Sequence, residues 1–309
     1  MDRGAYPEGG SGLNGRCRML RDGVWTVPLL LAVVLLPSCG GGGGGGRADA
    51  GTRSIEGDSG QVLRWKDEDN RYSSVVLIRS DLGFCSGVLV APRLVLTAAH
   101  CFCPPGGGMD PKKGEASCGR RAMAVSSFHE RAGEEPRTIL DTSEGTVVVH
   151  AEFRAETQGV GGRTLVKNRL ADLAVVRLER PLANTRVDRT LSREEVRLND
   201  ELTLVGYGTT DATGSNGGVR RLGRNTVSEL RSSSNPNGHE IGFRHPGAHA
   251  RPGDSGAPCF LEENGSRWLV GISSGYVSQG APESWFTSTY SYRDWIEGQI
   301  EQARKMESP

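Results

Sequence analysis

Short runs of apolar and β-branched residues, separated by glycine and proline, recur along the chain from about Ser74 onward. Seven runs stand out, over residues 74–78, 87–90, 94–96, 145–149, 173–178, 202–205 and 268–272. Many short strands at close spacing are typical of an antiparallel β-barrel or β-sandwich. Near the C-terminus the apolar spacing becomes helical, and basic residues close the last turn (Trp295, Ile296, Ile300, Ala303, Arg304, Lys305). The pattern therefore predicts an all-β fold followed by one helix over about 291–305.

A different apolar run lies near the N-terminus, over residues 24–36, with three arginines before it. Its 13 residues are too few for a membrane-spanning helix, which needs about 20, but they match the apolar region of a secretory signal. The run ends Leu36-Pro37-Ser38-Cys39, which resembles a bacterial lipobox, in which the cysteine is lipidated and becomes the mature N-terminus. An ordinary signal peptide with a chance cysteine is the alternative interpretation.

These features predict a signal peptide over 1–38, with Met19 as a candidate true start, and a lipidated Cys39. The seven glycines after it, Gly40–Gly46, begin a tether that extends to about residue 54. Glycine-rich chain behaves as random coil, so seven residues reach roughly 15 Å. We expect a protein that is secreted across the inner membrane and held at the outer membrane, facing the periplasm or the surface. Membrane is thus a predicted partner, through Cys39.

Composition narrows the classes of function. The chain has 37 basic and 37 acidic side chains and no net charge, whereas a nucleic-acid-binding domain usually carries a basic surplus or stripe. Nucleic acid is therefore not an expected partner. Hydrophobic residues make up 36% and charged residues 24% of the chain, which favours a globular protein over a disordered one.

Three segments carry candidate chemistry, in the order His, Asp, Ser along the chain. They are centred on His100, Asp172 and Ser255, within Thr97-Ala98-Ala99-His100-Cys101, Ala171-Asp172-Leu173 and Gly253-Asp254-Ser255-Gly256. A serine hydroxyl is a weak nucleophile at neutral pH and needs an adjacent base. An imidazole titrates near neutrality and can supply that base, while a buried carboxylate holds its tautomer and orientation. We therefore assign Ser255 as nucleophile, His100 as general base and then acid, and Asp172 as the orienting carboxylate.

At these residues the sequence resembles the chymotrypsin/trypsin-like serine proteases, and the resemblance extends from about residue 74 to 300. It includes Gly206-Tyr207-Gly208, 271–274 and 285–287. The resemblance implies two six-stranded antiparallel β-barrels over about 55–190 and 191–290, within a protease domain of residues 55–305. His100 and Asp172 would come from the first barrel and Ser255 from the second.

The same resemblance implies that peptide bonds are hydrolysed through an acyl-enzyme, without a metal or an organic cofactor, and that proteins or peptides are the substrates. The backbone N–H groups of Gly253 and Ser255 would form the oxyanion hole. An inactive protease-like surface binding protein is the alternative function. An α/β-hydrolase is disfavoured, because its nucleophile comes first along the chain, inside Gly-x-Ser-x-Gly.

Two details near residue 55 bear on activation. Gly57-Asp58-Ser59-Gly60 repeats the nucleophile tetrapeptide, but it precedes the histidine and lacks the following small residue and proline, so Ser59 is treated as a decoy. Ile55-Glu56-Gly57 resembles the new N-terminus that pairs with the aspartate before the serine in zymogen-type family members. Here that aspartate is Asp254, and whether cleavage near Ile55 is needed stays open.

The family resemblance also suggests cysteine and specificity roles. Cys85 and Cys101 match the disulfide beside the catalytic histidine, Cys103 and Cys118 are expected to pair across an insertion, and Cys259 is left as a buried small hydrophobe. His249 stands at the base of the primary pocket, where an aspartate would select Arg or Lys. Small apolar or acidic residues at the cleavage site are therefore more plausible. The other residues assigned to the substrate pocket are Ser274, Gly275, Tyr276 and Ser284, and Ser274–Tyr276 would hold the peptide extended by edge-strand pairing.

Overall fold

The computed structural model describes residue 63 and residues 65–104, 118–130, 138–160, 163–188, 190–210, 216–232, 239–277 and 281–307. The chain divides into Met1–Ser54 and Ile55–Pro309, and every described residue belongs to the second unit. The predicted signal, Cys39, the tether, Ile55 and Ser59 lie outside the described residues. Within the described part, no helix has the length and apolar character needed to cross a membrane.

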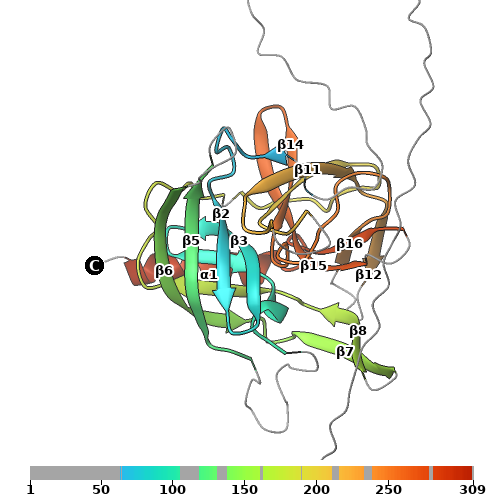
Figure 1. Ribbon diagram of the computed structural model, residues 1–309, viewed down its shortest axis with the longest axis horizontal. Coiled ribbons are helices and arrows are strands. Elements are labelled where there is room, and N and C mark those ends of the chain that lie inside the picture. Colours follow the sequence, from blue (N-terminus) through green and yellow to red (C-terminus); the bar gives the residue numbers. More distant parts are fainter. Residues whose placement is uncertain are drawn as a thin grey trace, which may run out of the picture. The chain divides into compact units, whose positions relative to one another are not determined.

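Six antiparallel strands close into a barrel (Figure 1). Around the barrel they follow the order β2 (Val75–Ser80), β3 (Gly83–Ala91), β4 (Leu94–Thr97), β9 (Ala174–Leu178), β6 (Thr138–Val149) and β5 (Arg121–His129). Apolar side chains of its strands, such as Val88, Leu96 and Val176, are fully buried. The five runs predicted as strands before residue 180 overlap β2, β3, β4, β6 and β9, because their β-branched residues fit the pleated wall of a packed barrel. The first predicted barrel is therefore confirmed.

In the described part of the second half, eight antiparallel strands form one sheet. Its order is β1 (Trp65–Lys66), β11 (Arg221–Thr226), β10 (Glu201–Gly206), β14 (Pro258–Glu263), β15 (Ser266–Val277), β16 (Glu283–Ser288), β13 (His239–Phe243) and β12 (Glu229–Ser232). β12 follows β11 in the chain after only Val227 and Ser228. At this corner the Val227 N–H donates to the carbonyl of Asp200, the residue just before β10. The next N–H, that of Ser228, donates to the Gly242 carbonyl of β13. The ladder is therefore interrupted at the corner, and a second closed six-stranded barrel stays a prediction.

β1 also departs from the expected division at residue 190. Trp65 and Lys66 pair with Leu222 and Arg221 of β11, so this early segment belongs to the second sheet and not to the first barrel. The predicted boundaries did not anticipate it, because a strand of two residues leaves almost no periodic signal.

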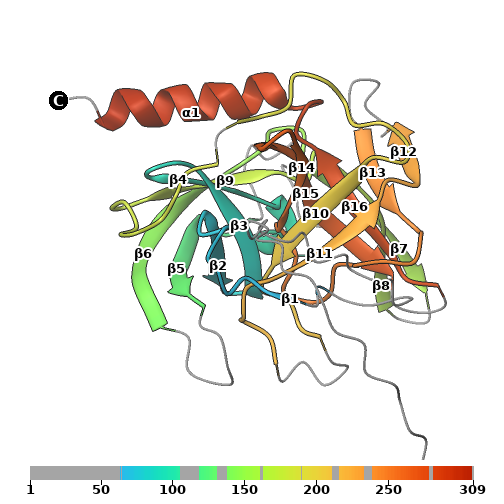
Figure 2. The same ribbon diagram turned by 90° about the horizontal axis from the view of Figure 1, so that it is seen from above.

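The predicted C-terminal helix is confirmed as α1 (Arg293–Glu307). Figure 2 shows α1 beside β4 and β9 of the barrel, where Arg177 of β9 donates to the side-chain oxygen of Gln299 at 3.0 Å. Ile296 and Ile300 are buried in the same apolar core as the barrel strands. Burial of this one face accounts for the helical spacing of apolar residues in the sequence.

Two smaller elements position the site. The 3₁₀-helix η1 (Ala99–Cys101) follows β4 directly. β7 (Arg154–Val160) and β8 (Arg163–Leu170) form a separate two-stranded hairpin, which Figures 1 and 2 both show on the side of the second sheet. β8 ends one residue before Ala171, whose φ of 48° is left-handed, an uncommon conformation for a residue other than glycine. The sharp turn at Ala171 leads straight into Asp172.

Candidate active site

The loop that carries Ser255 is held by Ser86 of β3. The Ser86 N–H donates to the Ser255 carbonyl at 2.7 Å, and the Ser86 hydroxyl donates to the Gly253 carbonyl at 2.8 Å. Gly253 and Gly256 have φ values of 96° and 78°, in the region that favours glycine. A Cβ at Gly256 would collide with the Thr97 hydroxyl and the Ser86 carbonyl. The glycines on either side of Asp254 and Ser255 are therefore required by backbone conformation and, at Gly256, by the close approach of the barrel.

The carboxylate of Asp254 points away from solvent and organises the same loop. Its Oδ1 accepts the Gly208 N–H at 2.7 Å and its Oδ2 accepts the Arg251 N–H at 2.9 Å. Burial raises the pKa of Asp254 to about 7, although these two backbone donors act in the opposite direction. Asp254 thus connects Gly208, which follows β10 in the chain, to the loop that carries Ser255.

His100 and Asp172 are joined by two hydrogen bonds. The backbone N–H of His100 donates to Asp172 Oδ1 at 2.9 Å, and His100 Nδ1 lies 2.6 Å from Asp172 Oδ2. The Asp172 side chain is fully buried, whereas 17% of the His100 side chain is exposed. This geometry places the proton of the neutral ring on Nδ1, which leaves Nε2 to accept a proton.

His100 and Ser255 line one cavity of about 390 Å³. The other lining residues are Asn168, Arg169, Arg231, Glu240, Ser274, Gly275, Tyr276, Val277, Glu283 and Trp285. The structure therefore brings together the serine and histidine that the sequence singled out, with Asp172 buried behind the histidine. It also brings Ser274, Gly275 and Tyr276 of β15 to the same cavity.

The two remaining residues assigned to the substrate pocket do not line this cavity. His249 and Ser284 are buried, and His249 Nδ1 lies 3.3 Å from the Ser284 hydroxyl, which also accepts the Ala250 N–H at 2.8 Å. Burial lowers the pKa of His249, so the ring favours its neutral form. Their assignment to the primary pocket stays a prediction.

The structure contains the two disulfides expected from the sequence. They join Cys85 to Cys101 and Cys103 to Cys118, while Cys259 is a free, buried thiol. Burial raises the pKa of the Cys259 thiol well above its ordinary value, which keeps it unreactive at neutral pH. The first disulfide ties β3 to η1, on which His100 sits.

Sequence reasoning missed several side chains of the cavity, among them three charged ones. Arg169 comes from β8, Arg231 from β12, and Glu240 from β13. The Arg231 guanidinium stacks over the Trp285 ring at 3.8 Å, a favourable cation–π geometry. Burial raises the pKa of Glu240 to about 7. No local motif marks these residues, because strands distant in the sequence bring them together.

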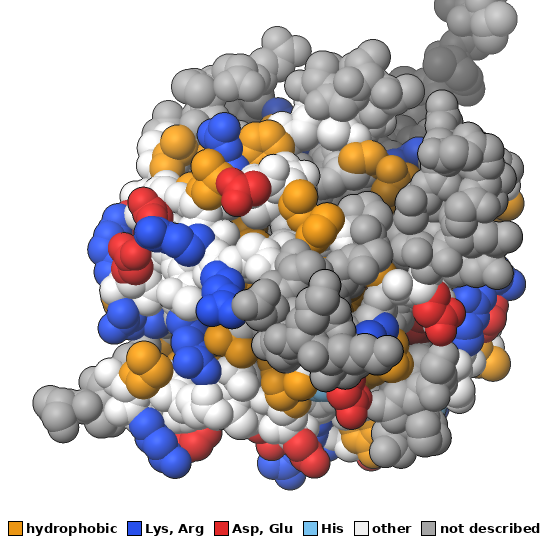
Figure 3. All heavy atoms as spheres, turned by 90° about the horizontal axis from the view of Figure 1, so that it is seen from below, with side chains coloured by type: hydrophobic (Ala, Val, Ile, Leu, Met, Phe, Trp, Pro, Cys, Tyr) orange, Lys and Arg blue, Asp and Glu red, His pale blue; other side chains and the backbone are white. Residues whose placement is uncertain are grey.

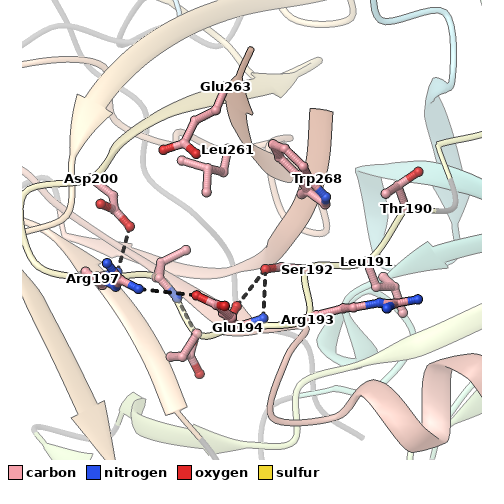
Figure 4. Close-up of a pocket in the computed structure, with 12 residues that line it drawn as sticks. Thr190, Leu191, Ser192, Arg193, Glu194, Arg197, Asp200, Leu261, Glu263 and Trp268 are labelled. Atoms are coloured by element: carbon pink, nitrogen blue, oxygen red, sulfur yellow. Dashed lines mark hydrogen bonds and ion pairs between the residues drawn. The ribbon is translucent and has the colours of Figure 1, made fainter. Parts of the chain in front are cut away.

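A second cavity, of about 350 Å³, is lined by residues 190–197 together with Asp200, Leu261, Glu263 and Trp268 (Figure 4). Some of its charged groups contact one another: the Arg197 side chain pairs with Glu194 at 3.2 Å, and the backbone N–H of Arg197 donates to the Asp200 carboxylate at 2.7 Å. It holds none of the residues His100, Asp172 or Ser255. The cavity beside His100 and Ser255 is therefore the candidate active site.

A β-barrel protein with a serine, a histidine and a buried aspartate gathered at one cavity has the arrangement found in β-fold serine proteases. The family model described as Trypsin matches residues 64–296 of this chain. The chain therefore belongs to the trypsin family.

Curated relatives and a solved structure agree with this family. The chain is 28% identical over 244 residues to phenoloxidase-activating factor 1 of Holotrichia diomphalia, covering 70% of this chain and 61% of that protein. It is 25% identical over 200 residues to spermosin of Halocynthia roretzi, covering 62% of this chain and 47% of that protein. The chain thus spans about half to three fifths of the length of these relatives. Human heparin binding protein shares the fold, with a TM-score of 0.50 at 20% identity, covering 77% of this chain and 95% of that one.

Proposed function

We propose that this protein is a serine endopeptidase that hydrolyses peptide bonds through an acyl-enzyme. One observation carries the proposal: His100 donates two hydrogen bonds to a fully buried Asp172, at the cavity that Ser255 also lines. The membership of the trypsin family supports it. Protein or peptide substrates are consistent with the end of β15, from Ser274 to Val277, which extends beyond β14 and lines the same cavity.

In the proposed mechanism, His100 Nε2 takes the proton of the Ser255 hydroxyl as that oxygen attacks the substrate carbonyl carbon. Asp172 stabilises the positive charge that forms on the imidazole and keeps its ring in place. The ring then gives the proton to the leaving amine, which departs and leaves an ester on Ser255. Water attacks that ester with His100 again as base, and the serine is released with its proton restored.

The proposed oxyanion hole is made of the backbone N–H groups of Gly253 and Ser255. The positive φ of Gly253 and the hydrogen bonds from Ser86 to the two carbonyls of this loop support a fixed loop conformation. Preorganised donors of this kind stabilise the developing negative charge, and each is worth about 10²–10³ in kcat.

The proposal is tested by labelling the purified full-length chain with a small fluorescent phosphonate that reacts with activated serines. We expect labelling of the wild-type chain and none of Ser255→Ala. Ser59→Ala is the matched control, because Ser59 lies in the same Gly-Asp-Ser-Gly tetrapeptide, and it should label like the wild type. Absence of labelling in the wild type would instead favour the inactive protease-like binding protein.

We further propose that Cys39 is lipidated and tethers the domain to a membrane. The support is the Leu36-Pro37-Ser38-Cys39 sequence after an apolar run, followed by glycines. Mass spectrometry of the purified protein should find an acylated Cys39 as the first residue, and Cys39→Ser should shift the protein to the soluble fraction. An unmodified cysteine in the mature chain would overturn this assignment.

A further inference from the structure

Arg169 bridges two groups at the proposed active site. It lies on β8, and its Nη1 donates to the Ser274 carbonyl of β15 at 2.6 Å. Its Nε lies 3.8 Å from Asp172 Oδ2, the oxygen that also contacts His100. In the described part of the chain this buried Nε makes no hydrogen bond. One guanidinium therefore spans from the proposed catalytic carboxylate to the strand edge.

The Ser274 carbonyl is on an open edge that an extended peptide would use. β14 begins at Pro258, which pairs with Ile272 of β15, so the stretch from Ser274 to Val277 runs beyond it and lines the cavity. A peptide that adds to a sheet edge donates its own N–H groups to such carbonyls. In this structure Arg169 already bonds to the Ser274 carbonyl, so a substrate N–H must compete with Arg169 for that oxygen.

We propose that Arg169 is a latch over the substrate-binding edge, and that a carboxylate on the substrate opens it. This inference rests on the proposed endopeptidase function. The Ser274 carbonyl offers the guanidinium one neutral acceptor. A carboxylate offers the opposite charge and two oxygens, and a bidentate contact can use Nε, which makes no hydrogen bond in the described part of the chain. An acidic side chain therefore replaces the Ser274 carbonyl as the partner of Arg169 and frees that carbonyl for the peptide backbone. A neutral amide side chain can accept from Arg169 but carries no opposite charge, so it competes less well with the Ser274 carbonyl.

The other charged side chains that line the cavity have different partners, so Arg169 is the one that a substrate carboxylate would draw away from the Ser274 carbonyl. Glu283 is paired with Arg244 at 3.3 Å, and Glu240 is buried in the wall of β13. Arg231 is stacked on Trp285 and paired with Glu229 at 3.3 Å. Arg169 is thus the lining guanidinium that contacts both the strand edge and Asp172.

The expected site of the carboxylate follows from strand geometry. Side chains of an extended peptide alternate between two faces. If the backbone N–H of the cleaved residue bonds to the Ser274 carbonyl, the side chain of the preceding residue points to the face opposite that of the cleaved residue's own side chain. The inference places Arg169 on the face of that preceding side chain, because Arg169 Nη1 reaches the same carbonyl. Substrates with Asp or Glu immediately before the cleaved residue are therefore preferred.

Opening the latch also affects the base. With its Nε 3.8 Å from Asp172 Oδ2, the Arg169 cation offsets part of the negative charge that would stabilise a protonated His100. When the guanidinium moves to a substrate carboxylate, the negative charge of Asp172 stabilises the protonated His100 more strongly. The same substrate group thus promotes binding and proton transfer.

The test digests a peptide library with the full-length chain and reads the cleavage sites by mass spectrometry. We expect Asp and Glu before the cleaved residue to be favoured over Asn and Gln about tenfold in kcat/KM. Arg169→Gln should abolish this preference and raise kcat/KM for neutral peptides. Arg231→Gln, which removes the other guanidinium that lines the cavity, should keep the preference. Equal cleavage of acidic and neutral peptides by the wild type would overturn the inference.

Two further measurements separate this inference from the proposed function. Phosphonate labelling does not need the strand edge, so a wild type that labels but shows no acidic preference retains the function and loses the latch. In the Ser255→Ala background, fluorescence polarisation measures binding of one acidic peptide and its amide analogue without catalysis. Arg169→Gln should remove the difference between them, and an unchanged difference would contradict the latch. If Arg169→Gln fails to fold, the ratio of acidic to amide peptides in the wild type decides alone.

Discussion

At the scale of single residues, the contact between Asp172 and His100 sets the tautomer on which proton transfer depends. Asp172→Asn keeps the size of the side chain but lets its amide donate to Nδ1, which puts the ring proton on Nε2. We expect kcat to fall by about four orders of magnitude, with little change in folding. The measurement is kcat on a cleaved peptide together with a thermal melt. Loss of less than tenfold would remove Asp172 from the proposed mechanism.

Asp254 gives a prediction about pH. Its pKa is about 7 in the folded protein, against 3.8 ordinarily, so between these values the folded state holds a proton that the unfolded state releases. The free energy of unfolding therefore falls as the pH rises from about 4 to 7. Asp254→Asn removes this titration while costing a backbone hydrogen bond at every pH.

We expect the wild type to lose more stability than Asp254→Asn over this pH range, by an amount on the order of a few kcal/mol. Urea unfolding at pH 4, 5, 6 and 7 measures both slopes. Glu240→Gln is a parallel control, because burial also raises its pKa to about 7 and its effect should add independently. Parallel curves for the wild type and Asp254→Asn would show that Asp254 is ionised throughout.

The residues gathered at the cavity also show what a sequence can predict. His100, Asp172 and Ser255 each stand in a short local motif, and the cavity and the Asp172–His100 bonds bring them together. Arg169 carries no motif, and the segment Cys85-Ser86-Gly87 does not show what the Ser86 side chain contacts. The importance of Ser86 and Arg169 comes from contacts with Ser255 and Ser274, which are more than 100 positions away in the chain. Such contacts depend on register between strands, and periodicity along one strand does not encode them.

At the scale of elements, the best-predicted ones have a continuous buried face. α1 was predicted within two residues of its observed start and end, because Ile296, Ile300 and Ala303 repeat at helical spacing and all pack on the barrel core. β12 was not predicted, since its four residues are partly or fully exposed and resemble the turns around them. Likewise the interruption between β11 and β12 depends on bonds to two different partner strands, which the local sequence does not reveal.

Packing of α1 yields a prediction at this scale. Ile296 is fully buried, so Ile296→Ala should lower the free energy of unfolding by about 2–4 kcal/mol through lost burial and a residual cavity. Met306→Ala in the same helix is the matched control, because Met306 is 67% exposed and should change stability by less than about 0.5 kcal/mol. Chemical denaturation measures both. Equal effects of the two variants would mean that α1 does not stabilise the barrel.

At the scale of the whole described unit, acidic and basic side chains are interspersed on the face drawn in Figure 3, as the zero net charge allows. One basic side chain of this unit is instead fully buried. Arg220, which precedes β11, is fully buried and its Nε donates to Asp67 at 2.8 Å. Its other guanidinium nitrogens donate to the Phe128 carbonyl, the Tyr207 hydroxyl and the Asn70 side chain.

This cluster joins parts that are far apart in the chain. Phe128 is on β5 of the barrel, whereas Arg220 and Tyr207 adjoin β11 and β10 of the second sheet. The Arg220 N–H also donates to Glu130, just after β5, at 2.9 Å. A buried ion pair gives little net stability by itself, but loss of one partner leaves an uncompensated charge. Arg220 therefore couples the folding of the barrel to that of the sheet.

Arg220→Met should lower the free energy of unfolding by about 3–5 kcal/mol, because Asp67 stays buried without its cation. Adding Asp67→Asn removes that charge, so the double variant should recover part of the loss, and a double-mutant cycle gives the coupling. If the cluster couples the two halves, the wild type unfolds in one transition and Arg220→Met shows a lower denaturant m-value or a second transition. Arg121→Met is the control, since the Arg121–Glu144 pair is exposed and worth less than about 1 kcal/mol. An Arg220→Met variant as stable as this control would mean that the two halves are joined by apolar packing alone.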